Sequence, residues 1–148
     1  ATRMLRRIAT ANMSNLDAQG HMYVRRIFNA KDVEDLLKDA PAEERQFFAE
    51  CQNNLVSAES KSGGIPLVLT LAEATGVEPA EYQFRHISFQ EALFVQTLLE
   101  DERTPVFPFE TDATELLEIL NVPAYENTWR IGGVKLGRKL LGAREGRG

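Results

Sequence analysis

Residues 82–99 read YQFRHISFQEALFVQTLL, and this segment is more informative about the architecture than any other part of the chain. Tyr82 and Phe84 alternate with polar residues, which predicts a short strand. Ser88 and Glu91 have the spacing of a capping box, in which each side chain accepts a hydrogen bond from the backbone amide of the other residue. A helix is therefore expected to begin at Ser88, and His86 is expected on rigid structure where strand and helix join.

The helix that follows His86 is expected to be largely buried. Phe89 and Leu93 follow one helical face and Phe94 and Leu98 follow the neighbouring face, so the apolar arc is wide. The residues alone leave two interpretations of His86 open. It is either a core histidine that bonds a backbone carbonyl or a histidine that contacts a ligand.

The bulk properties fit one domain, or one domain with a small appendage. The chain has 148 residues, of which 43% are hydrophobic and 26% are charged. No apolar run approaches the roughly 18 residues of a membrane span. Cys51 is the single cysteine, which rules out an internal disulfide and favours a reducing compartment, such as the cytoplasm or an organelle interior, without identifying it. Helical spacing with Phe48 makes Cys51 a small buried hydrophobe, and two histidines provide no cluster with metal-ligand spacing.

The charge is distributed unevenly. Residues 29–128 hold 20 acidic residues against 6 basic ones, whereas both ends of the chain are basic. This acidic middle argues against a DNA-binding domain, and a nucleic-acid partner is not expected. The basic residues near the C-terminus are either docking residues for an acidic protein or a lipid surface, which would allow peripheral membrane association, or a solvated helix face; they include Arg130, Lys135, Arg138 and Lys139.

Several further elements follow from periodicity and capping signals. Residues 1–13 are expected to form a helix, because a buried stripe recurs at helical spacing: Met4, Leu5, Ile8 and Met13. Asn29 is expected to cap a helix through Lys38, with Asp32 in its first turn. Residues 42–55 predict another helix after Pro41. Residues 21–28 fit either a short strand or a helical turn.

The remaining segments are predicted less directly. Residues 65–76 are interpreted as a helix, because Pro66 suits a first turn and Gly76 suits a C-cap, although the periodicity also fits a strand. Thr111 is expected to cap a helix through about Leu120. Residues 129–141 have helical spacing weakened by glycines, which suggests close packing. The fold class expected from the pattern is mainly α with one small β-hairpin.

The order of these segments, and one motif above all, resembles the winged-helix domain of NACHT-type signal-transduction NTPases, the class that includes the NOD-like receptors. In that family the winged helix ends in an aromatic-x-His-x-Ser/Thr-Phe-Gln-Glu motif, which this chain matches with Phe84, His86, Ser88, Phe89, Gln90 and Glu91. The resemblance implies a winged-helix-like domain over residues 1–101. A C-terminal helical segment over residues 102–141 and a disordered tail over residues 142–148 are expected after it.

The resemblance also implies a role for His86. In the family, the winged-helix histidine contacts the β-phosphate of ADP in a neighbouring nucleotide domain and holds the inactive state. This chain contains no G-x-x-x-x-G-K-[ST] loop, so no nucleotide cofactor is expected on it alone; ADP or ATP would bind only in a longer parent protein. The chain begins at Ala1, which suggests a processed product, a trimmed polypeptide or a fragment.

Two functions remain open from the sequence. The first is a non-catalytic regulatory domain that contacts protein partners and senses nucleotide. The second is a small structural or docking subunit of a larger assembly that reuses the same scaffold. No catalytic residues, metal ligands or enzymatic activity are expected, because no nucleophile–base set or paired carboxylates occur in a defined frame.

Overall fold

The computed structural model describes residues 1–54, 64–100 and 121–145. The described elements follow one another in this order: α1 (Thr2–Met13), β1 (Asn15–Leu16), β2 (Met22–Tyr23), β3 (Ile27–Asn29), α2 (Ala30–Leu37), α3 (Ala42–Asn54), β4 (Val68–Ala72), β5 (Glu81–Phe84), α4 (Ile87–Glu100), η1 (Pro123–Tyr125) and α6 (Glu126–Glu145). The mainly helical fold class is therefore confirmed. The predicted helix over residues 111–120 and the predicted tail lie outside the described residues, except for 142–145, which belong to α6.

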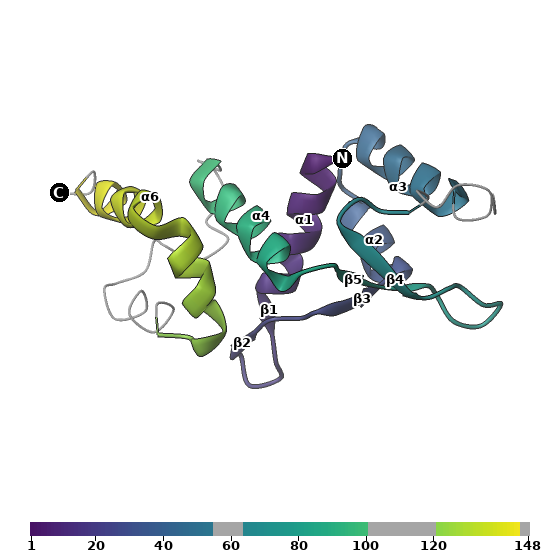
Figure 1. The fold of residues 1–148 in the computed structure, drawn as a ribbon, viewed down its shortest axis with the longest axis horizontal. Helices are drawn as coiled ribbons and strands as arrows, with labels where there is room; N and C mark the ends of the chain where they lie inside the picture. The colour runs from purple at the N-terminus through teal and green to yellow at the C-terminus, as the bar shows by residue number, and fades with distance from the viewer. Residues whose placement is uncertain (55–63, 101–120, 146–148) are drawn as a thin grey trace.

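A three-stranded antiparallel sheet with the strand order β3-β5-β4 lies against α1, α2 and α3 (Figure 1). β5 is central, and its Tyr82 pairs with Phe28 of β3 and with Thr70 of β4. The inward residues of the sheet join the helices in the first core, whose most completely buried side chains include Met4, Ile8, Phe28, Val33, Leu37, Tyr82 and Phe84. β3 makes the sheet larger than the hairpin that the sequence predicts. A separate two-residue pairing joins β1 to β2.

A second core lies on the other side of α1, where α4 packs between α1 and α6 (Figure 1). Phe94 stacks on Tyr125 with ring centroids 6.0 Å apart, and Trp129 meets Tyr125 edge-on at 5.9 Å. Burial raises the pKa of Tyr125 to about 12. Its hydroxyl donates to the carbonyl of Met13, which ties η1 to the end of α1. α4 therefore contributes to both cores, as its wide apolar arc predicts.

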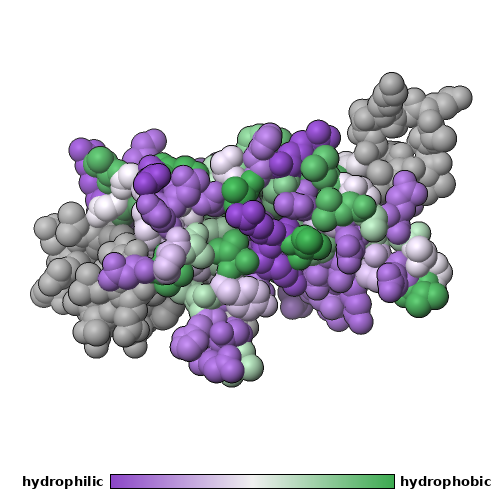
Figure 2. Space-filling model, turned by 60° about the horizontal axis from the view of Figure 1, so that its bottom comes forward, coloured by the Kyte–Doolittle hydropathy of each residue, from purple (hydrophilic) through white to green (hydrophobic). Residues whose placement is uncertain are grey.

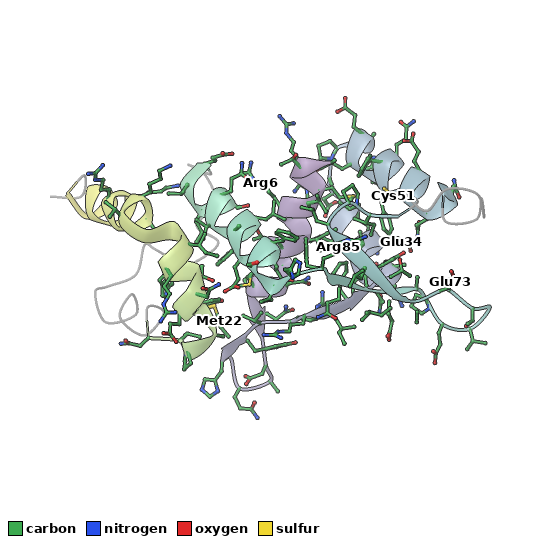
Figure 3. The ribbon with its side chains drawn as sticks, in the orientation of Figure 1. Arg6, Met22, Glu34, Cys51, Glu73 and Arg85 are labelled. Carbon is green, nitrogen blue, oxygen red and sulfur yellow. The ribbon has the colours of Figure 1, made fainter. Side chains whose placement is uncertain are left out.

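Local signals predict the N-terminal helices correctly. α1 buries all four residues of the predicted stripe, and α2 begins at the predicted cap. Asn29 and Asp32 form a complete capping box, in which each side chain accepts from the other's backbone amide at 2.9 Å. α3 buries Cys51, and this burial raises the pKa of the thiol, as expected of a structural cysteine (Figure 3).

The helix predicted for residues 65–76 is wrong, because the structure has β4 here. Gly64 and Leu67 both have positive φ angles, of 133° and 63°, so the chain cannot enter a helix at Pro66. Val68 then pairs with Phe84 and Leu69 with Gln83, and the ladder satisfies the backbone groups that a helix would have satisfied internally. The ambiguous residues 21–28 likewise contain β2 and the start of β3.

α6 bends where the sequence places its paired glycines. Gly133 has a φ of 48°, which interrupts the regular helix. A Cβ on Gly132 would lie 1.9 Å from Cδ1 of the buried Leu136. The contact at Gly132 confirms the predicted close packing at that residue, whereas Gly133 marks the bend and a Cβ on Gly133 or Gly137 would meet no atom within 4 Å. Within the described residues, no helix is both long enough and apolar enough to cross a membrane.

Candidate functional site

His86 lies between β5 and α4 with its side chain exposed. Its carbonyl accepts a hydrogen bond from the amide of Phe89 at 3.0 Å, and its ring meets the Phe89 ring edge-on, with centroids 5.2 Å apart. Because Phe89 packs against the first core, the backbone under His86 is held on both sides. The interpretation of His86 as a buried core histidine is therefore wrong. The imidazole instead faces solvent from a rigid junction.

The helix start differs from the predicted capping box. α4 begins at Ile87, so His86 precedes the helix and Ser88 lies exposed in the first turn. The Glu91 carboxylate is not paired with the Ser88 amide. It accepts a hydrogen bond from Nδ2 of Asn127 in α6 at 3.0 Å. A partner from a distant element has replaced the local one, because Glu91 is buried under α6.

The other matched motif residues are structural. Phe84 is buried at the end of β5, with its ring centroid 6.0 Å from that of Phe28. Gln90 is fully buried and joins three elements: it accepts from Asn12 Nδ2 at 3.0 Å and donates to the carbonyl of Arg25 at 3.1 Å. The motif therefore separates into two exposed residues, His86 and Ser88, and neighbours that hold the helix in place.

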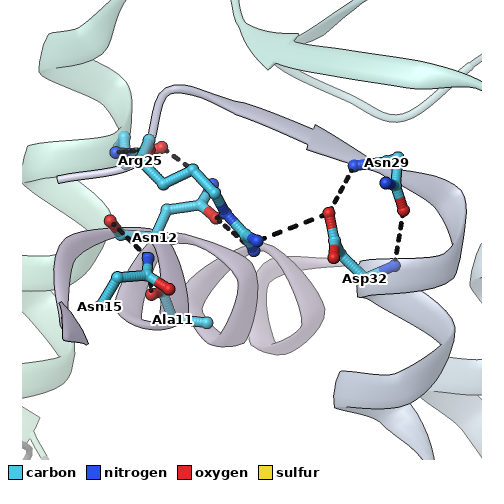
Figure 4. A network of polar contacts seen from close by, with 7 residues as sticks. Ala11, Asn12, Asn15, Arg25, Asn29 and Asp32 are labelled. Carbon is cyan, nitrogen blue, oxygen red and sulfur yellow. Dashed lines mark hydrogen bonds and ion pairs between the residues drawn. The ribbon is translucent and has the colours of Figure 1, made fainter. Parts of the chain in front are cut away.

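A polar network extends from Gln90 through Asn12 and Arg25 to the start of α2. Figure 4 shows the part of it from Asn12 to Asn29. The Arg25 guanidinium donates to Oδ1 of Asn12 at 3.3 Å and lies 3.5 Å from the carboxylate of Asp32. Asp32 in turn belongs to the capping box with Asn29. The network thus links α1, the segment before β3, α2 and α4. The sequence does not predict the roles of Asn12 and Arg25, because no local pattern indicates hydrogen-bond partners in separate segments of the chain.

A groove of about 750 Å³ lies between the β1–β2 pair, the first turn of α4 and the η1–α6 segment. Its lining is largely apolar and includes Met13, Met22, Val24, Ile87, Val122 and Pro123. Glu91 and Asn127 also line it, together with the charged residues Arg26, Glu126 and Arg130. Figure 3 places Met22 below α4, where β2 approaches the start of α6. No pattern in the sequence predicts this groove.

The predicted basic docking residues do not share one environment. Arg130 is exposed and pairs with Glu126 of the preceding helical turn at 2.8 Å. Lys135 and Arg138 are exposed, whereas Lys139 is half-buried and donates to the carbonyl of Leu98 in α4. Lys139 therefore helps to hold α6 on α4.

The outer face of the sheet carries an exposed apolar row. Ile27 of β3 and Leu69 of β4 both pair with Gln83 of the central strand, and the side chains of Ile27 and Leu69 are 52% and 40% exposed. Leu71, also on β4, adds to the row. Figure 2 shows apolar residues on this side of the molecule, bordered by polar ones. The predicted helix over residues 65–76 gave no indication of this row, because Leu69 and Leu71 are exposed on the same face only in a strand.

The described residues contain no group of three or more histidine, cysteine or acidic side chains arranged to hold a metal ion. The groups with clearly raised pKa values, Cys51, Tyr82 and Tyr125, are buried core residues whose pKa values rise because of burial. The arrangement favours recognition through an exposed imidazole and a groove. No protein-family model, curated protein or solved structure matches this chain.

Proposed function

We propose that this chain is a non-catalytic regulatory domain, the winged-helix segment of a NACHT-like signalling NTPase, and that His86 senses bound nucleotide. The observation that carries the proposal is the exposed imidazole of His86 on a rigid strand–helix junction. The order α1–β3–α2–α3–β4–β5, with the sheet order β3-β5-β4, also supports it, because a winged helix has this arrangement.

The physical basis is a charge-assisted hydrogen bond. An imidazole N–H that meets a phosphate oxygen in a shielded interface contributes about 1.5–3 kcal/mol. The preceding strand and the hydrogen bond from the Phe89 amide hold the backbone of His86, so little backbone entropy is lost on contact. Loss of the phosphate would release the contact and shift a two-state equilibrium between closed and open arrangements.

The test is the ADP affinity of the longer parent protein with and without His86→Ala. We expect affinity to fall about 10- to 100-fold, the equivalent of one charge-assisted hydrogen bond. His21→Ala is the matched control, because His21 is the other histidine of the chain and lies exposed in the β1–β2 loop. Unchanged ADP affinity and unchanged switching in His86→Ala would remove the sensing role.

A second candidate function is a docking subunit of a larger assembly. The exposed apolar row of Ile27, Leu69 and Leu71 favours it, because clustered apolar side chains on a surface mark interaction sites. The intact mass of the native polypeptide separates the two functions. A mass close to that of these residues alone would eliminate nucleotide sensing in cis and favour the docking subunit.

A further inference from the structure

The groove beside α4 contains a carboxylate that is almost completely buried. Glu91 is 4% exposed and lines the groove. Its hydrogen bond comes from Asn127, a neutral amide, and none of the ion pairs among the described residues includes Glu91. An ionised carboxylate offers about four acceptor positions, so one amide leaves most of them unused.

The burial of such a carboxylate costs free energy unless a cation binds to it. Burial of a charge without an opposite charge is strongly unfavourable, and a second charged group with good hydrogen-bond geometry offsets that cost. The nearby basic side chains on the groove are not bonded to Glu91. Arg130 pairs with Glu126 at 2.8 Å, and Arg26 is exposed at the edge.

The volume and the lining of the groove indicate which class of ligand it can bind. A volume of about 750 Å³ exceeds what one side chain fills, so a ligand must also cover the apolar lining of the groove. Met22 is half-buried in that lining, and a methionine side chain adapts to apolar partners of irregular shape. The carboxylate favours arginine over lysine, because a planar guanidinium binds a carboxylate through two parallel hydrogen bonds and is less strongly hydrated.

We propose that this groove binds a segment of a partner protein that inserts an arginine side chain onto Glu91 and packs apolar neighbours against the half-buried Met22 and Ile87. The groove contains neither His86 nor the apolar row of the sheet. The proposal is therefore independent of nucleotide sensing and goes beyond the proposed function.

The test uses the full chain with labelled methionine methyl groups and a short blocked peptide with one arginine between two leucines. Methyl resonances report position, because Met22 is half-buried and lines the groove, whereas Met4 and Met13 are completely buried in the first and second cores. We expect the peptide to shift the Met22 resonance and to leave Met4, in the first core, unchanged. No saturable shift, or equal shifts at Met4, would overturn the proposal.

Two comparisons test the carboxylate itself. Glu91→Gln keeps an acceptor for Asn127 and should weaken binding about 10- to 100-fold, whereas Glu126→Gln, at an exposed carboxylate of the same groove, should change it less than about threefold. A peptide with citrulline in place of arginine has nearly the same shape without the charge, and it should bind wild-type protein as weakly as the arginine peptide binds Glu91→Gln.

The citrulline comparison needs no variant, so it remains decisive even if Glu91→Gln unfolds. Equal affinity for the arginine and citrulline peptides would overturn arginine recognition. So would unchanged affinity of the arginine peptide for a folded Glu91→Gln protein.

Discussion

The side-chain carbonyl of Gln90 accepts a hydrogen bond from the side-chain amide of Asn12 at 3.0 Å, across the interface between α4 and α1. Both residues are almost completely buried, and Gln90 also donates to the carbonyl of Arg25. This one side chain therefore satisfies polar groups from two other segments. It lies one helical turn after His86 and fixes the helix on which that junction depends.

Replacement of Gln90 should be strongly destabilising. Gln90→Ala leaves the Asn12 amide and the Arg25 carbonyl without this partner and opens a cavity, so we expect the free energy of unfolding to fall by about 2–4 kcal/mol. Urea denaturation measures the change. Gln96→Ala on the same helix is the control, because Gln96 is only half-buried and bonds Glu100 at the surface. A loss below about 0.5 kcal/mol for Gln90→Ala would contradict the assigned role.

Loss of the capping box of α2 should reduce the free energy of unfolding by a smaller amount. Asn29→Ala removes the acceptor for the Asp32 amide and should reduce the free energy of unfolding by about 1 kcal/mol. Asn29→Asp keeps that acceptor and should largely retain stability. Asn53→Ala, at an exposed position in α3, controls for the loss of an asparagine side chain. Equal urea midpoints for Asn29→Ala and Asn53→Ala would show that the cap contributes nothing.

Gly132 and Gly137 of α6 differ in a measurable way. Gly132→Ala should destabilise by about 1–3 kcal/mol, because the new Cβ would overlap the buried Leu136 side chain. Gly137→Ala meets no atom within 4 Å and should be neutral or stabilising by up to about 1 kcal/mol. Thermal unfolding of the two variants should shift the midpoint in opposite directions or shift it for Gly132→Ala alone. A stabilised Gly132→Ala protein would refute the close contact.

The raised pKa of Tyr125 predicts that the folded protein loses stability at high pH. Its pKa rises to about 12 in the folded protein, so the neutral phenol is favoured, and the associated stability is complete below the unfolded pKa of about 10. This contribution of Tyr125 to the free energy of unfolding should fall by about 2–3 kcal/mol as pH rises from about 10 to about 12. Tyr125→Phe should flatten part of this dependence and cost about 1 kcal/mol near neutral pH through the lost bond to the Met13 carbonyl. Tyr82 remains as a second buried phenol whose pKa is raised by burial. The measurement is urea denaturation across this pH range together with absorbance titration of tyrosinate. Identical pH profiles for Tyr125→Phe and wild type would contradict the assignment.

The predictions that the structure confirms depend on interactions between near neighbours. The capping box of Asn29 and Asp32, the buried stripe of α1 and the glycines of α6 all act over one or two helical turns. The cap acts within one helical turn, and the spacing of the α1 stripe already shows which face of that helix is apolar. The junction of β5, His86 and α4 is predictable to within one residue of the helix start, although Glu91 bonds Asn127 rather than the Ser88 amide.

Tertiary structure decided the rest. Residues 65–76 have a periodicity that fits helix or strand, and the ladder between β4 and Phe84 and Gln83 of β5 determined the strand. Glu91 has the spacing of a capping residue, yet packing against α6 gave it Asn127 as donor and buried its carboxylate in the groove. The sequence by itself determined the helices and the junction, because short-range hydrogen bonds and periodicity specify them. Strand pairing, the exposure of His86 and the groove depend on which distant surfaces exclude water together, and only the packed chain specifies that.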